Sequence, residues 1–182
     1  MPLTTENVAS ATGCDPAVVA IALPIITASL TAQGINKPQT LVGILATMAT
    51  ESGMKPVAEA FWLSEAARNA YFDHTAYGKV DPTTGQRYYG RGFCQLTWKS
   101  NYEHYGSELK QDFVNHPELL LQYHSSSDVI VLFFIEHGLD KLCESAGSAT
   151  DAVWTEVRRK FNGGTNGLAK FLKCVANLMK LV

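Results

Sequence analysis

Apolar residues recur at helical spacing over residues 39–52, and this pattern constrains the fold more than any other feature of the chain. The spacing i, i+3, i+4, i+7 marks one face of an α-helix, and it occurs here in Leu41, Ile44, Leu45 and Met48. Gly53 and Pro56 end the segment. Glu51 lies seven residues after Ile44, on the same face. The sequence therefore predicts a packed helix whose last turn carries a partly buried carboxyl group.

Most of the remaining chain shows the same helical character. Further helices are expected, mostly between capping residues, glycines and prolines, at residues 6–11, 17–33, 65–72, 98–105, 118–123, 129–137, 152–161 and 167–181. The second of these is apolar almost all round, so we expect it to be central and buried, with a kink or a break at Pro24. The turn at residues 81–85 separates two short segments that favour a small β-hairpin, 79–80 and 86–89. The predicted fold is mainly α.

Length and composition indicate one globular domain. The chain has 182 residues, of which 46% are hydrophobic, and this is enough apolar material for a core. We expect a single domain over residues 1–182 with two lobes. The larger helical lobe would contain residues 1–56 and 95–182, and the smaller one residues 57–94, with a cleft between them.

Charge and spacing argue against several classes of partner. The net charge is −2 and no block of like charges occurs, so we expect no nucleic-acid binding. The histidines lack metal-ligand spacing, so we expect no metal site. The apolar run from Val18 to Ile26 is too short to span a bilayer and contains Pro24, so we expect no stable membrane insertion.

Glu51 is the strongest candidate for a catalytic residue. Its position on the apolar face predicts partial desolvation, and its position in the last turn places it at the negative end of the helix dipole. Both effects favour the protonated carboxylic acid, which is the form that a general acid needs. The alternative is a surface glutamate near a helix end.

A second carboxylate follows eight residues later, at Glu59. A continuous helix would separate the two acids by about 12 Å, but Gly53 and Pro56 allow the chain to turn back. An inverting glycosidase uses two carboxyl groups that lie roughly 6.5–9.5 Å apart. Glu65 is the competing second acid, although its place in the first turn of a predicted helix is explained by the helix dipole alone.

The segment from Tyr88 to Thr97 combines glycines with aromatic, guanidinium and amide groups. Glycines let a backbone pass close to a ligand, and aromatic faces suit sugar rings. Hydroxyl and N-acetyl groups suit the neutral hydrogen-bonding groups of Gln95, Thr97 and Asn101. The alternative is an ordinary β-turn with packed tyrosines.

Three motifs in this order resemble the glycoside hydrolase family 19 chitinase-like proteins, including the lysozyme-like endolysins of phages that infect Gram-negative bacteria. They are Thr50-Glu51-Ser52-Gly53, Tyr89-Gly90-Arg91-Gly92-x-x-Gln95-Leu96-Thr97-Trp98-x-x-Asn101-Tyr102 and Arg159-x-x-Asn162-Gly163-Gly164-x-Asn166-Gly167. The resemblance covers nearly the whole chain. Thr50 stands where the family often has histidine, and Phe93 where it often has proline, as in some phage-type members. The spacing of the two acids is about one residue shorter than in such members.

The resemblance implies a role for each matching residue. Glu51 would be the general acid, Glu59 the base that activates water, and Thr97 the hydroxyl group that helps to hold this water. Arg91 would lie beside the catalytic acids and keep Glu59 ionised. The substrate-binding positions would be Tyr89, Arg91, Gln95, Asn101 and Asn162.

The implied function is inverting hydrolysis of the β-1,4 bonds between N-acetylmuramic acid and N-acetylglucosamine in peptidoglycan, on a two-lobed lysozyme-like fold, without a metal or cofactor. Such an endolysin lyses its bacterial host. The N-terminal residues lack the basic segment of a secretory signal, so we expect a monomer in the host cytoplasm that reaches the periplasm through a separate membrane-permeabilising protein. The alternatives are a chitinase that acts on N-acetylglucosamine polymers and an inactive cell-wall-binding protein on the same fold.

Overall fold

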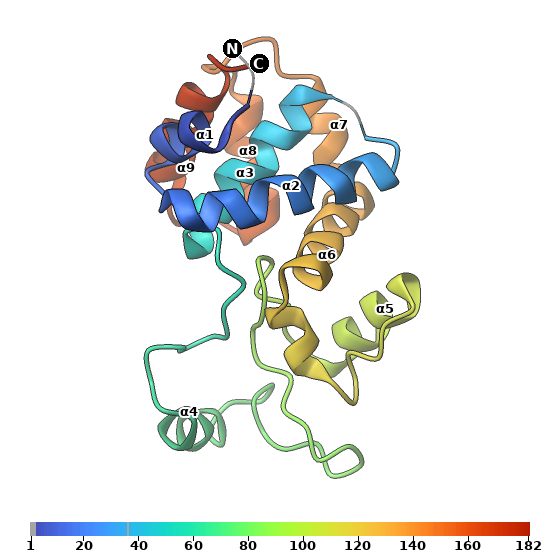
Figure 1. Ribbon diagram of the computed structural model, residues 1–182. Helices are drawn as coiled ribbons and strands as arrows, with labels where there is room; N and C mark the ends of the chain where they lie inside the picture. The colour runs from blue at the N-terminus through green and yellow to red at the C-terminus, as the bar shows by residue number, and fades with distance from the viewer. Residues whose placement is uncertain (1–2, 36) are drawn as a thin grey trace. The chain divides into compact units, whose positions relative to one another are not determined.

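The computed structural model describes residues 3–35 and 37–182, and over this part of the chain the protein is mainly helical, as predicted (Figure 1). Residues 1–2 of the predicted domain and Asn36 lie outside the description. In chain order the helices are α1 (Thr5–Thr12), α2 (Pro16–Ala32), α3 (Pro38–Ser52), α4 (Glu65–Phe72), α5 (Lys99–Leu109), the 3₁₀ helix η1 (Pro117–Leu121), α6 (Tyr123–Glu136), α7 (Leu139–Glu144), α8 (Val153–Asn162) and α9 (Leu168–Leu178).

The predicted β-hairpin is wrong. In the described residues, β-pairing is limited to isolated bridges between Ala58 and Arg91 and between Arg91 and Leu96. The turn at residues 81–85 is closed by two backbone hydrogen bonds of 2.8 Å, from Gly85 N–H to the Asp81 carbonyl and from Asp81 N–H to the Gln86 carbonyl. The side chain of Asp81 adds to them, because its Oδ1 accepts the backbone N–H groups of Thr83 and Thr84, each at 3.0 Å. Hydrogen bonds from the Thr83 hydroxyl and Lys99 hold the pKa of Asp81 well below its usual range. The result is an isolated turn that is stabilised by its own side chain and is not extended into a strand ladder.

The chain divides into two compact units. The first contains Met1–Lys55 and Ile130–Val182, and the second contains Pro56–Val129. The predicted small lobe at residues 57–94 falls inside the second unit, which continues to Val129. Helix α6 begins in the second unit and continues into the first.

The core of the first unit is built around α3. Thr40 and every residue from 42 to 49 are buried. Gly43 allows α7 to approach closely, because a Cβ there would lie 2.5 Å from Cys143 Sγ. The prediction that α2 is the central buried helix is wrong: α2 is apolar all round, but one side faces solvent, with Ile21 49% exposed. The helix continues through Pro24, which lies on this exposed side.

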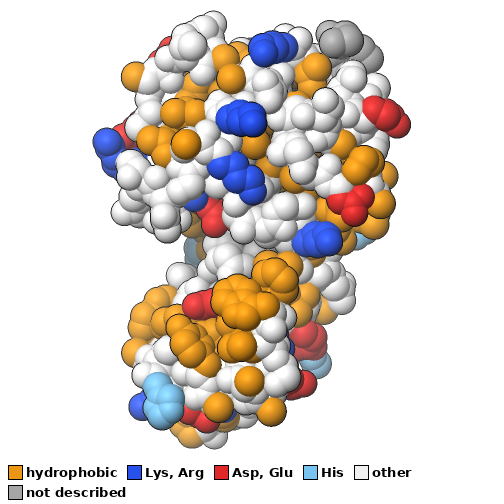
Figure 2. Space-filling view, turned by 90° about the vertical axis from the view of Figure 1, so that its left-hand side faces the viewer, with side chains coloured by type: hydrophobic (Ala, Val, Ile, Leu, Met, Phe, Trp, Pro, Cys, Tyr) orange, Lys and Arg blue, Asp and Glu red, His pale blue; other side chains and the backbone are white. Residues whose placement is uncertain are grey.

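The core of the second unit is aromatic. The Phe72 ring stacks on the Tyr89 ring with 4.5 Å between centroids, next to Ala58 and Ala60. Several large side chains of this unit are exposed, among them Phe61, Trp62, Tyr71 and Trp98. Figure 2 shows hydrophobic side chains gathered on one face of this unit. The unit therefore combines a packed interior with an aromatic surface.

The start of α6 differs from the prediction, and its early residues contact the glycine-rich segment, residues 88–97. The predicted helix begins at residue 129, whereas α6 begins at Tyr123, and the serines at residues 125–127 are buried inside it. Ser126 Oγ accepts the backbone N–H of Phe93 at 2.7 Å. A Cβ at Gly92 would lie 2.7 Å from the same oxygen, so Ser126 requires glycine there.

Among the described residues, none of the helices taken alone has both the length and the apolar character of a membrane span. Helices α1 and α2 reach that length and character only when they are counted together, and they are bent by 112° relative to each other.

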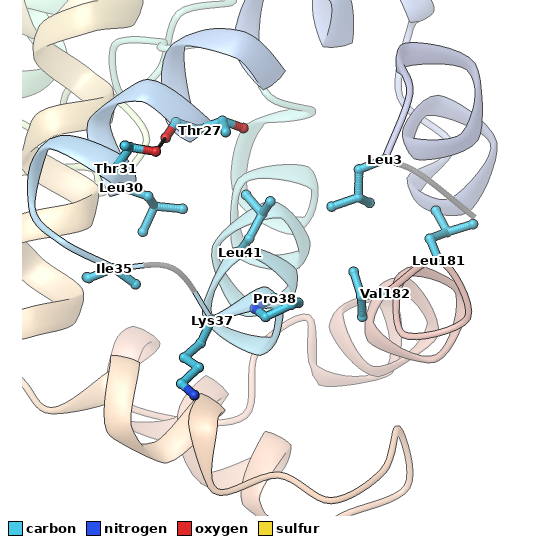
Figure 3. A pocket seen from close by; sticks show the side chains of 10 residues that line it. All are labelled: Leu3, Thr27, Leu30, Thr31, Ile35, Lys37, Pro38, Leu41, Leu181 and Val182. Carbon is cyan, nitrogen blue, oxygen red and sulfur yellow. Dashed lines mark hydrogen bonds between the residues drawn. The ribbon is translucent and has the colours of Figure 1, made fainter.

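The first unit contains a cavity of about 310 Å³ with mainly aliphatic walls, including Leu30, Leu41 and Leu181 (Figure 3). None of the predicted site residues lines this cavity.

Candidate active site

Glu51 lies in the last turn of α3 and forms an ion pair with Arg158 of α8. The Glu51 side chain is 20% exposed, whereas that of Arg158 is 3% exposed. The guanidinium Nε of Arg158 also donates to the Asn166 carbonyl at 2.8 Å, which fixes the arginine from its other side. The carboxyl group is therefore accessible to solvent but held by a buried cation.

Sequence reasoning missed Arg158. The third motif begins one residue later, at Arg159, which is exposed and pairs with Glu156 at 3.0 Å. The signal that could have identified Arg158 is its spacing, because Trp154, Val157 and Arg158 follow the i, i+3, i+4 pattern on the buried face of α8. An arginine on an apolar helix face needs an internal partner, and Glu51 supplies it.

Replacing Arg158 with methionine is expected to lower the free energy of unfolding by about 3 kcal/mol, because the change leaves Glu51 without its buried partner. Chemical denaturation measures this change. In a double-mutant cycle, adding Glu51→Gln should remove part of the loss, since no unpaired carboxylate then remains. Equal stability of Arg158→Met and wild type would contradict a structural role for the pair.

The backbone near Glu51 is also closely packed by the segment before α9. Gly167 has φ +69°, and a Cβ there would lie 2.9 Å from Thr50 Cγ2. Glycine in the third motif is therefore required by both backbone conformation and space. Asn162, the predicted substrate-binding residue of this motif, is the last residue of α8 and is exposed.

Glu59 belongs to the second unit, where two donors hold its carboxylate. The Tyr77 hydroxyl donates to Oε1 at 3.0 Å, and the Gly90 backbone N–H donates to Oε2 at 3.1 Å. The backbone N–H of Glu59 donates in turn to the Gly90 carbonyl at 2.7 Å. Glu59 is therefore fixed against the glycine-rich segment, with one donor for each carboxylate oxygen.

Tyr77 is a second residue that sequence reasoning missed. Partial burial, together with the hydrogen bond and charge of Glu59, raises the pKa of Tyr77 to about 12. The hydroxyl is therefore a donor at neutral pH. Its ring contacts Phe72 and Trp98, with 6.0 and 5.5 Å between centroids. The contact joins residues 18 positions apart, on either side of helix α4, so no helical or strand period could have indicated it.

Replacing Tyr77 with phenylalanine should remove one donor from Glu59 and keep the ring packing. We expect kcat to fall about tenfold, the usual scale for one charge-assisted hydrogen bond, with little change in KM or melting temperature. Steady-state kinetics and calorimetry measure these quantities. Tyr71→Phe, in an exposed tyrosine of the same unit, is the matched control and should behave like wild type. An unchanged kcat in Tyr77→Phe would exclude a role in positioning Glu59.

Arg91 is buried and built into the second unit. Its Nη1 donates to the Arg87 carbonyl at 2.8 Å and to the Tyr102 hydroxyl at 2.9 Å. The guanidinium carbon lies 3.8 Å from the centroid of the Tyr89 ring, a cation–π contact. Burial raises the pKa of Tyr102 to about 12, and its hydroxyl donates to the Tyr89 carbonyl at 2.6 Å. These contacts of Arg91 and Tyr89 hold the segment from Tyr88 to Thr97 in place. Substrate binding by either residue stays a prediction.

The other predicted residues of the second motif form a connected turn. Gln95 Nε2 donates to the carbonyls of Val57 and Gly92 at 2.9 and 3.0 Å. The Thr97 hydroxyl donates to the Gln95 carbonyl at 2.8 Å, and Asn101 Nδ2 donates to the Thr97 carbonyl at 2.7 Å. The structure thus brings Gln95, Thr97 and Asn101 together, and Gln95 ties them to the segment that carries Glu59.

The competing acid, Glu65, is the first residue of α4 and is exposed. Ser64 caps this helix, because its hydroxyl oxygen accepts the Ala67 N–H at 3.3 Å. The helix dipole accounts for a carboxylate at this position. Across the described residues, no group of three or more histidine, cysteine, aspartate or glutamate side chains is arranged to hold a metal ion.

Glycoside hydrolases work with a pair of carboxyl groups, and the structure holds both candidate glutamates, Glu51 and Glu59, in place through specific partners. Sequence comparison agrees with this class. The family model for glycoside hydrolase family 19, described as chitinase class I, matches residues 46–148. This match covers more than half of the chain, and the protein belongs to this family. The match includes Glu51, Glu59 and the second motif, whereas Asn162 lies beyond it.

Two curated relatives are similar over shorter segments. Chitinase-like protein 1 of Arabidopsis thaliana is 40% identical over 53 residues, which are 29% of this chain and 16% of that protein. An acidic endochitinase of Petunia hybrida is 53% identical over 36 residues, which are 20% of this chain and 14% of that protein. The matched part is therefore less than a fifth of the length of either relative.

Proposed function

We propose that this family 19 glycoside hydrolase is an endolysin that cleaves the β-1,4 bonds between N-acetylmuramic acid and N-acetylglucosamine in peptidoglycan. The observation that carries the proposal is the pair of glutamates, Glu51 and Glu59, each held in place by a defined side chain: Glu51 by Arg158, and Glu59 by Tyr77. The sequence resemblance to lysozyme-like phage endolysins favours peptidoglycan as the polymer.

In the proposed mechanism, Glu51 donates a proton to the glycosidic oxygen as the bond to the anomeric carbon breaks. Glu59 accepts a proton from a water molecule that attacks the opposite face of this carbon, and the Thr97 hydroxyl helps to hold the water. The product has inverted configuration. Arg158 would stabilise the carboxylate that Glu51 becomes after it has donated its proton. The two acids then exchange protons with solvent and return to their starting states.

The surface of the second unit supports a carbohydrate substrate. Trp98 is 49% exposed, and its ring contacts Tyr77, the partner of Glu59. Exposed aromatic rings can stack on the apolar faces of sugar rings. Gln95, Thr97 and Asn101 would bind hydroxyl and N-acetyl groups, as would Asn162 in the first unit. Both peptidoglycan and chitin offer these groups, so the polymer has to be identified by experiment.

Product analysis by mass spectrometry tests the proposal. Purified sacculi and chitin oligosaccharides are incubated separately with the wild-type protein. New reducing ends at N-acetylmuramic acid would establish a muramidase, whereas reducing ends at N-acetylglucosamine would indicate a glucosaminidase. Cleavage of chitin oligosaccharides with intact sacculi would overturn the endolysin proposal.

A chitinase that acts on N-acetylglucosamine polymers is the second candidate, because the matching family model describes class I chitinases and one relative is named an endochitinase.

For the endolysin, we propose that a monomer accumulates in the host cytoplasm and acts in the periplasm after a separate protein has permeabilised the membrane.

A further inference from the structure

Basic residues are concentrated at the C-terminal end of the sequence. Residues 157–182 contain six lysines and arginines and no aspartate or glutamate, although the whole chain has a net charge of −2. All of these residues belong to the first unit, which also contains Glu51. Figure 2 shows several basic side chains on the face of the first unit that is turned to the viewer.

One of these lysines reaches the backbone beside Glu51. Lys170, in the first turn of α9, has its Nζ 3.5 Å from the carbonyl oxygen of Thr50, the residue before Glu51. Lys173 follows three residues later, so both side chains project from the same face of the helix, and both are exposed. An accessible positive charge therefore lies next to the proposed proton donor.

The rest of α9 argues against a membrane as the partner of these lysines. The apolar residues Phe171, Cys174, Val175 and Leu178 are buried in the first unit. A helix that binds the membrane interface needs its apolar side free to enter the lipid. Here that side is already occupied by the core, and the exposed side presents ammonium groups.

The two candidate polymers differ in charge. Chitin is neutral, whereas peptidoglycan carries carboxylates on the peptide stems attached to N-acetylmuramic acid. We propose that Lys170, assisted by Lys173, binds a stem carboxylate of peptidoglycan and thereby selects this polymer over chitin. This inference rests on the proposed function and adds a specificity-determining surface to it.

The expected effect is modest, local and sensitive to salt. Lys170→Gln should lower kcat/KM on sacculi about fivefold, the upper end for one exposed ion pair, and the difference should shrink at high ionic strength. Lys170→Glu should lower it further. Lys180→Gln removes the same charge ten residues along the chain and serves as the matched control. It should behave like wild type, since Lys180 lies beyond the end of α9.

The experiment compares three substrates: native sacculi, sacculi whose carboxylates have been converted to amides with a carbodiimide and methylamine, and chitin oligosaccharides. Lys170→Gln should differ from wild type only on native sacculi. Equal losses for Lys170→Gln and Lys180→Gln, or an equal loss on amidated sacculi, would overturn the inference and leave the muramidase activity standing.

A binding measurement separates this inference from the proposed catalytic function. In the Glu51→Gln background, cosedimentation with native sacculi should weaken when Lys170→Gln is added and should not weaken with Lys180→Gln. This comparison holds even if the wild-type protein cuts neither polymer. Unchanged binding to sacculi, combined with Lys170-dependent binding to vesicles of phosphatidylglycerol and phosphatidylethanolamine, would identify a membrane as the partner and refute the inference.

Discussion

Replacing Glu51 with glutamine is expected to lower kcat on sacculi about 1,000-fold, because the amide cannot donate the proton that the leaving oxygen requires. The fold should persist, since the glutamine side-chain oxygen can still accept a hydrogen bond from Arg158. Initial rates of lysis of outer-membrane-permeabilised cells, together with product release from purified sacculi, measure the effect. Circular dichroism checks that the variant is folded.

This variant also decides between an enzyme and an inactive cell-wall-binding protein on the same fold. Lysis by folded Glu51→Gln at the wild-type rate would contradict catalysis by Glu51. If the wild-type protein binds sacculi but releases no product, the binding protein becomes the better description.

Glu59→Gln should lower kcat about 100-fold to 1,000-fold, as expected when a general base is lost. The amide can still accept hydrogen bonds from Tyr77 and Gly90, so its position should be kept. Glu65→Gln is the comparison, because Glu65 is the other acid that sequence reasoning left open. Its exposed place in the first turn of α4 predicts activity close to wild type.

Steady-state kinetics on one sacculus preparation rank the two variants. A larger loss in Glu65→Gln than in Glu59→Gln would identify Glu65 as the second acid. It would also make the hydrogen bonds of Glu59 to Tyr77 and Gly90 a structural feature of the second unit.

The sequence by itself determined the mainly α fold, the family and the extent of several helices. Helix α4 has the predicted bounds, residues 65–72, and Ser64 caps it. Gly53 ends α3, as predicted, and does so in the left-handed conformation. These features depend on residues within a few positions of one another, so local periodicity and capping are enough to predict them. The sequence likewise identified Glu51 and Glu59 as candidates, without their partners.

Only the tertiary structure decided which side chains hold these candidates. The ion pair of Glu51 with Arg158 joins residues 107 positions apart, and no local pattern encodes such a contact. Tyr77 reaches Glu59 from a segment without regular secondary structure, and the expected hairpin is an isolated turn in which Asp81 accepts hydrogen bonds from Thr83 and Thr84. Burial made the same distinction for α2 and α3. Both sequences are apolar, but the core of the first unit surrounds α3 and covers only one side of α2. The sequence of α2 could not indicate this difference, because a helix that is apolar on all sides does not specify which side the core will cover.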